Sequence, residues 1–143
     1  MNILVSACLL GVACRYDGKS KPNEKAIKLK EKFNLIPVCP ESLGGLPSPR
    51  KPSEISGDRV ISQDGNDVTV QYNKGASETL RIAKLFDCEI AVMKEKSPSC
   101  GNGTVHNGKF DGGLTDGDGI TVRLLKQNGI KVFGESEIDL IVK

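Results

Sequence analysis

The chain has few aromatic residues and a single histidine. Across its 143 residues, Phe, Trp and Tyr together make up 4%, Trp is absent, and His106 is the only histidine. Charge of one sign is also lacking, because 20 basic and 18 acidic side chains leave a net charge of +2. This balance gives no electrostatic reason to expect duplex nucleic acid or an anionic membrane as a partner. Apolar residues still make up 38% of the chain, which is typical of a globular protein and not of general disorder.

Long apolar runs and nucleotide-binding glycine motifs are missing as well. No run reaches the roughly eighteen apolar residues that a membrane-spanning helix requires. Residues 1–8 show neither the basic region nor the apolar stretch of a signal peptide. Neither GxGxxG nor the P-loop pattern occurs, so dinucleotide and nucleoside-triphosphate binding have no motif support. We therefore expect a cytoplasmic protein with no membrane partner, whose cysteines stay reduced.

The order of apolar runs predicts a single α/β domain over residues 1–143. Buried strands are expected at residues 2–7, 35–38, 90–93 and 130–133, and helices at 22–33, 74–86 and 120–127, with a short helix from 135. This alternation favours a Rossmann-like, short parallel sheet of about four strands flanked by helices. Residues 59–62 and 68–72 flank an Asp-Gly-Asn-Asp turn and predict a small β-hairpin insertion. Asn73 is then expected to cap the following helix.

Three of the five cysteines follow expected strands. Cys8 comes after the first strand, Cys39 after the second, and Cys100 a few residues after the third. Because ligands bind beyond the carboxyl ends of parallel strands, these thiols are expected on one edge of the sheet. Three converging thiolates suit a four-iron cluster in which one iron stays open to a small ligand. Taken singly, however, each cysteine fits a small buried hydrophobe at least as well, and no CxxC motif is present.

The other two cysteines carry weaker signals. Cys88 lies between a helix and a strand with no turn partner, so we interpret it as a core residue. Cys14 follows Cys8 closely, and its position fits a spare ligand, a thiol beside a ligand, or a core residue equally.

Several short motifs recur together along the chain. They are SACLLG at 6–11, CRYDG at 14–18, VCPE at 38–41, GGLP at 44–47, PR at 49–50, SPSCG at 97–101 and GDG at 117–119. In this order the sequence resembles the thiouracil desulfurase family over most of its length. The resemblance implies a Rossmann-like domain that binds a 4Fe–4S cluster through Cys8, Cys39 and Cys100. It also implies removal of sulfur from a thiocarbonyl base without net redox change.

Catalytic candidates lie beside two of these cysteines. Water attack on a thiocarbonyl carbon needs a proton acceptor, and departure of sulfur needs a donor. Glu41 lies two residues after Cys39 and is the first candidate, although a solvated loop carboxylate is an equal alternative. Ser97 and Ser99 precede Cys100 and fit either contacts to substrate and cluster or a local serine turn.

Substrate-binding candidates are basic or aromatic loop residues. Arg15, Tyr16 and Asp17 fit recognition of a base edge or a phosphate, with Tyr16 able to stack on a base. A charged turn closed by Gly18 explains the same residues. Arg50 fits neutralisation of a cluster or binding of an anion, with a surface salt bridge as the alternative.

Two further features have structural explanations. His106 precedes Asn-Gly, so we expect it in a surface turn. Residues 112–119 are glycine-rich and fit either a mobile flap or a plain loop.

These observations favour an enzyme with a 4Fe–4S cofactor that removes sulfur as sulfide from a small thiolated base or nucleoside, such as thiouracil. A non-catalytic iron–sulfur module, serving as a sensor or sulfur carrier, is the alternative. A zinc site formed by the three cysteines is a further possibility, which the lack of colour would reveal.

Overall fold

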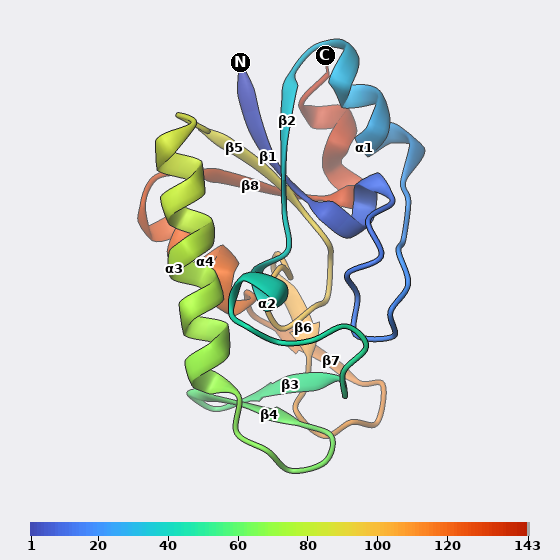
Figure 1. Ribbon diagram of the computed structural model, residues 1–143, viewed down its shortest axis with the longest axis vertical. Coiled ribbons are helices and arrows are strands. Elements are labelled where there is room, and N and C mark those ends of the chain that lie inside the picture. Colours follow the sequence, from blue (N-terminus) through green and yellow to red (C-terminus); the bar gives the residue numbers. More distant parts are fainter. Residues whose placement is uncertain (143) are drawn as a thin grey trace.

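The computed structural model describes residues 1–142 and centres on a parallel four-stranded sheet (Figure 1). The strand order is β2-β1-β5-β8, formed by β1 (Asn2–Ser6), β2 (Asn34–Val38), β5 (Ile90–Met93) and β8 (Lys131–Gly134). All three pairings in this sheet are parallel. The predicted α/β class and its four-stranded parallel sheet are therefore confirmed.

Both faces of the sheet are covered because side chains alternate along the buried strands. Ile3 and Val5 of β1 pack on one side with residues of α1, η2 and η3, while Leu4 packs on the other side with residues of α3 and α4. The covering elements are α1 (Glu24–Lys28), η2 (Leu29–Glu31), η3 (Glu135–Leu140), α3 (Thr69–Leu85) and α4 (Ile120–Gln127). Figure 1 shows α3 and α4 on one side of the sheet and α1 on the other.

Two antiparallel hairpins lie below the sheet in Figure 1, beyond the carboxyl ends of its strands. One pairs β3 (Ser53–Ser56) with β4 (Arg59–Ser62), and the other pairs β6 (Thr104–His106) with β7 (Leu114–Asp116). The prediction of a small hairpin is confirmed, and its strand at residues 59–62 is β4. The second predicted strand, 68–72, is wrong, because residues 69–72 belong to α3 and β4 pairs instead with β3. The hairpin turn falls at residues 57–58, between β3 and β4.

The start of α3 explains this error. Val70 is 73% exposed while Thr69 and Tyr72 are buried, which is helical spacing and not strand alternation. The Thr69 hydroxyl also accepts the N–H of Val60, so β4 packs on the helix start. Asp67 accepts the N–H of Thr69. Asn73 therefore lies exposed inside the helix, and the prediction that it caps the helix is wrong.

A short helix that the sequence analysis did not predict, α2 (Pro40–Leu43), packs closely on α3. Two glycines permit this approach. A Cβ on Gly75 would lie 1.9 Å from the carbonyl oxygen of Pro40, and a Cβ on Gly44 would lie 2.0 Å from that of Gln71. The backbones of α2 and α3 are thus in direct contact, and this contact sets the position of the residues around Cys39. None of the helices in residues 1–142 has the length and apolar character needed to cross a membrane.

Candidate active site

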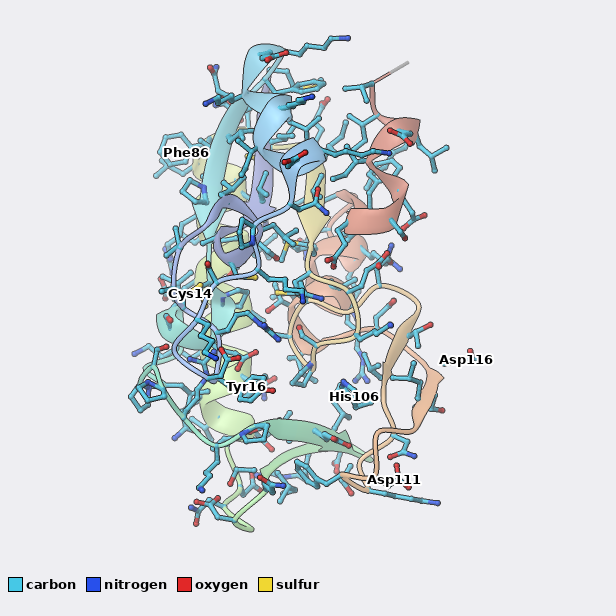
Figure 2. All side chains as sticks on the ribbon, turned by 90° about the vertical axis from the view of Figure 1, so that its right-hand side faces the viewer. Cys14, Tyr16, Phe86, His106, Asp111 and Asp116 are labelled. Atoms are coloured by element: carbon cyan, nitrogen blue, oxygen red, sulfur yellow. The ribbon has the colours of Figure 1, made fainter. Side chains whose placement is uncertain are left out.

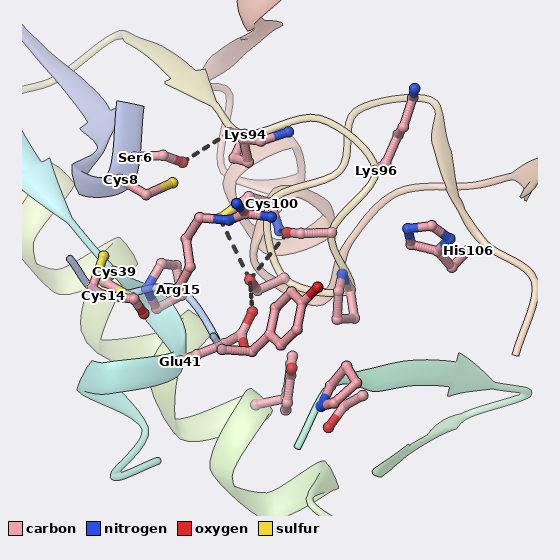
Figure 3. A pocket seen from close by; sticks show the side chains of 18 of the residues that line it. Ser6, Cys8, Cys14, Arg15, Cys39, Glu41, Lys94, Lys96, Cys100 and His106 are labelled. Carbon is pink, nitrogen blue, oxygen red and sulfur yellow. Dashed lines mark hydrogen bonds between the residues drawn. The ribbon is translucent and has the colours of Figure 1, made fainter. Parts of the chain in front are cut away.

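Four of the five cysteines line one cavity at the carboxyl edge of the sheet. The cavity has a volume of about 400 Å³ and is bounded by the sheet edge, α2 and both hairpins. Cys8, Cys14, Cys39 and Cys100 lie on one side of it in the close view, and His106 lies on the opposite side (Figure 3). Cys88 lies elsewhere, buried between α3, α4 and the sheet. All five cysteines are free thiols.

The parallel sheet accounts for this convergence. Cys8 lies in η1 (Ala7–Leu10), directly after β1, and Cys39 directly follows β2. Cys100 lies in the loop after β5, which is the neighbour of β1 on its other side. The Ser97 hydroxyl accepts the N–H of Cys100 at 2.7 Å and fixes the turn that carries this thiol.

Cys39 is the thiol with the most polar surroundings. Its thiol lies 3.6 Å from the backbone carbonyl oxygen of Cys14, to which it donates, and its sulfur accepts a hydrogen bond from Ser42 Oγ at 3.3 Å. Side-chain hydrogen bonding with Cys14 is the main cause that holds the pKa of Cys39 well below its ordinary value, against the opposing effect of burial. The same side-chain hydrogen bonding, followed by burial, raises the pKa of Cys14.

Burial is the main cause of the pKa shifts of the other two thiols. It raises the pKa of Cys8 to about 11 and that of Cys100 to about 12. The charge of Cys39 adds to the effect at Cys8, while Lys94 and Arg15 oppose it. These thiols therefore lack enough positive charge from the chain to ionise at neutral pH, and a bound metal would supply that charge.

The chemistry of the donors in the cavity suits an iron–sulfur cluster, which cysteine thiolates hold. Within residues 1–142, no group of three or more His, Cys, Asp or Glu side chains is placed to hold one metal ion. A mononuclear zinc site needs all its sulfurs about 2.3 Å from one point. A four-iron cluster places its thiolates on separate irons, so its ligands stand farther apart. The donor set of the cavity thus fits an iron–sulfur cluster.

A carboxylate and a hydroxyl lie beside Cys100. Glu41 Oε2 accepts a hydrogen bond from Ser99 Oγ at 2.9 Å, and this hydroxyl lies 3.4 Å from Cys100 Sγ. Glu41 Oε1 accepts from Arg50 Nε at 3.0 Å. The side chains of Arg50 and Glu41 are only 8% and 14% exposed, so neither the solvated-loop interpretation of Glu41 nor the surface salt bridge of Arg50 applies.

Arg15 and Tyr16 line the same cavity, and Asp17 does not. The guanidinium of Arg15 lies over the ring of Tyr16, with 5.6 Å between its Cζ atom and the ring centroid. Asp17 pairs with Arg15 and accepts the N–H of Lys19, as expected for a turn. Figure 2 shows Tyr16 and His106 on different segments, both above the β3–β4 hairpin.

The cavity also contains residues that the sequence analysis missed. His106 lies on β6 and lines the cavity, so its assignment to a surface turn is wrong, and its Nδ1 is buried without a partner among the described residues. Tyr72 of α3 and Glu54 of β3 are buried and line the cavity as well. Burial, followed by the charge of Glu41, raises the pKa of Tyr72. Of residues 112–119, only Gly112 lines the cavity, and 114–116 form β7.

Comparison with known sequences assigns the chain to a family. Residues 3–137 match the sequence profile of 2-thiouracil desulfurase. The chain belongs to the 2-thiouracil desulfurase family. It is 41% identical over 150 residues to the uncharacterized protein YbbK of Bacillus subtilis (strain 168), covering 98% of this chain and 99% of that protein.

A solved structure from this desulfurase family supports the same assignment. The chain is 40% identical to the 4Fe–4S-dependent thiouracil desulfidase TudS, with a TM-score of 0.93 over 99% of this chain and 95% of that one. The fold therefore matches that of a thiouracil desulfidase over nearly the whole chain. Five of the seven motifs that carried the resemblance contribute residues to the cavity, whereas those at 44–47 and 117–119 do not.

Proposed function

We propose that this protein removes sulfur from a small thiolated base or nucleoside, such as thiouracil, with a 4Fe–4S cluster held by Cys8, Cys39 and Cys100. The proposal has support from two directions. The similar structure is a 4Fe–4S-dependent thiouracil desulfidase, and the cavity gathers four thiols, the ligands that such clusters use. Three ligands leave one iron with an open position, as substrate activation at a metal requires.

When bound, the cluster would supply a thiophilic Lewis acid that takes the sulfur of the thiocarbonyl group and polarises its carbon. Water contributes the oxygen of the new carbonyl group, and sulfur leaves as hydrogen sulfide. No electrons are gained or lost overall, so the protein has to manage only proton movements and substrate position.

The contact between Glu41 and Ser99 beside Cys100 is the observation that carries the catalytic proposal. Glu41 Oε2 would take a proton from the attacking water, directly or through the Ser99 hydroxyl, and return it to the departing sulfur. Ser97 supports this pair, because its Oγ lies 3.4 Å from that of Ser99 and also fixes the Cys100 turn. A module that only holds a cluster has no need of a buried carboxylate at this point.

The segment after η1, which carries Arg15 and Tyr16, would recognise the substrate. Tyr16 is 41% exposed at the cavity, so its ring can stack on a base, and Arg15 can face the base edge. Asp17 would hold Arg15 in place from outside the cavity. We further propose that residues 1–143 act as one domain and that the reaction takes place in the cytoplasm.

The test is anaerobic purification followed by an absorption spectrum, an iron assay and incubation with 4-thiouracil. We expect a brown protein with about four irons per chain that produces uracil and sulfide. Cys8→Ala, Cys39→Ala and Cys100→Ala should lose iron. Cys88→Ala is the matched control, because this buried cysteine lies outside the cavity, and it should keep iron and activity.

Glu41→Gln separates catalysis from cluster binding. It should keep the iron and lower kcat by roughly 10²- to 10⁴-fold, the usual contribution of a general acid–base group. A brown wild-type protein that leaves thiolated bases intact would overturn the proposed reaction and favour a sensor or sulfur carrier. A colourless protein that cannot be reconstituted with iron and sulfide would overturn the cluster and favour zinc.

A further inference from the structure

Arg50 occupies an unusual place behind the carboxylate of Glu41. Its backbone N–H donates to the carbonyl of Tyr16 at 2.7 Å, so its main chain is fixed to the segment that carries Arg15 and Tyr16. Its side chain extends into the protein, where only 8% of it is exposed. An arginine bound by its backbone at one end and buried at the other has little freedom to follow a substrate.

The guanidinium group joins three separate segments. Nε donates to Glu41 Oε1 at 3.0 Å, Nη1 donates to the carbonyl of Pro47 at 3.0 Å, and Nη2 donates to the carbonyl of Cys14 at 3.1 Å. All three nitrogen atoms are thus engaged by the protein. This arrangement argues against the anion-binding role expected from the sequence, because an incoming anion would have to displace or share these partners.

Arg50 fixes the orientation of the Glu41 carboxylate group. With Oε1 held by Arg50, Oε2 is the oxygen that meets Ser99 Oγ at 2.9 Å, next to Cys100. A carboxylate free to rotate would turn its plane away from Ser99 and lose the alignment that proton transfer requires. The burial of both side chains keeps water from taking over the role of Arg50.

We propose that Arg50 is the positioning residue of the reaction, holding one carboxylate oxygen of Glu41 so that the other faces Ser99 and the reacting group. The inference rests on the proposed function, since it assigns Arg50 a role through Glu41. Arginine is suited to it because its planar fork donates in several fixed directions, whereas lysine places its charge at a single point.

The experiment is a double-mutant cycle on the iron-loaded enzyme with Arg50→Lys, Glu41→Gln and the double variant. Arg50→Lys keeps the positive charge, and we expect it to lower kcat about 10- to 100-fold, as misplacement of a catalytic group does, with KM little changed. In the Glu41→Gln background the same change should have almost no further effect on kcat, because its target is gone. Losses that multiply would show that Arg50 acts independently of Glu41 and would overturn the inference.

Two measurements separate this role from a merely structural one. Iron content and absorption spectrum should be unchanged in Arg50→Lys, and a crystal structure of that variant should show Glu41 turned away from Ser99. The matched control is Arg59→Lys. Arg59 donates from the same atom to a carboxylate, Nε to Asp67 Oδ2 at 2.8 Å, but this pair is exposed and lies outside the cavity, so kcat should stay at the wild-type value.

A second variant keeps the test decisive if Arg50→Lys does not fold. Glu41→Asp retains both the acid and Arg50 but shortens the side chain, so the carboxylate can no longer span Arg50 and Ser99. We expect a loss of kcat close to that of Glu41→Gln, and full activity would overturn the inference. A wild-type protein without desulfurase activity would overturn the proposed function and the role of Arg50 together, whereas an active wild type with multiplicative losses would overturn only the latter.

Discussion

Gly75→Ala tests whether the contact between α2 and α3 positions the active site. Alanine in the middle of a helix is favoured over glycine by about 1 kcal/mol, so helix propensity alone predicts a more stable protein. The structure predicts the opposite, because the new Cβ would lie 1.9 Å from the carbonyl oxygen of Pro40. That atom belongs to the backbone, so no side-chain rotation can relieve the clash, and α2 and α3 would have to separate by about 1 Å or more.

Overpacking of this kind costs about 1–3 kcal/mol, and a rigid backbone atom favours the upper half of that range. After the gain in helix propensity, we expect a net loss of about 1–2 kcal/mol in the free energy of unfolding. For a chain of this length the loss corresponds to a Tm lower by roughly 2–8 °C. Thermal unfolding of the iron-free protein, followed by circular dichroism, measures it without interference from cluster loss.

Ser77→Ala is the matched control, since Ser77 is exposed on the same helix two residues away. It gains helix propensity without a clash, so its Tm should equal or slightly exceed that of the wild type. A Gly75→Ala protein as stable as Ser77→Ala would refute the reasoning, because α2 would then not rest on the backbone of α3. Since Pro40 lies between Cys39 and Glu41, we also expect weaker iron retention in Gly75→Ala.

Three further predictions concern single residues. In the iron-free protein at neutral pH, iodoacetamide should alkylate Cys39 before Cys8. Alkylation of Cys39 should also persist to more acidic pH, because its lowered pKa retains the reactive thiolate as pH falls. Peptide mass spectrometry of the alkylated protein measures the order. Cys88→Ala should lower the unfolding free energy by about 1 kcal/mol without loss of iron, whereas Cys100→Ala should lose iron, as denaturation and iron assays would show. Glu54→Ala should speed amide hydrogen exchange at residues 108–110, because Glu54 Oε1 accepts the N–H groups of Gly108 and Phe110, and unchanged exchange would contradict that role.

The strands and the cysteine edge could be predicted because both depend on local sequence patterns. Apolar runs at β1, β2 and β5 place their ends within a residue or two of the observed positions, and parallel pairing then brings the following cysteines together. Helix α4 was predicted with its observed bounds, Ile120–Gln127. The apolar residues at 68–72 fit both the strand period and the helix period, so the local pattern does not distinguish the two. In the folded protein the burial of Thr69 and Tyr72 favours the helix.

The groups around the thiols depend on long-range contacts that no local pattern reveals. The pairing of Glu41 with Arg50 spans a loop with Pro47 and Pro49, and the contact of Glu41 with Ser99 joins segments 58 residues apart. His106 lines the cavity because the β6–β7 hairpin lies below the sheet, beyond the carboxyl ends of its strands (Figure 1). A turn-like sequence around a histidine identifies the hairpin but not the surface against which it packs.

The electrostatics of the cavity connect cluster loading to proton release. Cys8 and Cys100 are protonated at neutral pH without metal, because burial raises the pKa of both thiols. Glu41, by contrast, has its charge compensated by Arg50, a residue that needs no metal. Binding of the proposed cluster would therefore displace protons from at least these two thiols. The chain thus compensates the charge of the proposed proton-transfer carboxylate through Arg50, whereas the proposed cofactor would have to compensate its buried thiolates. The proposed cluster would then assemble more easily as pH rises, with the Glu41–Arg50 pair already in place without it.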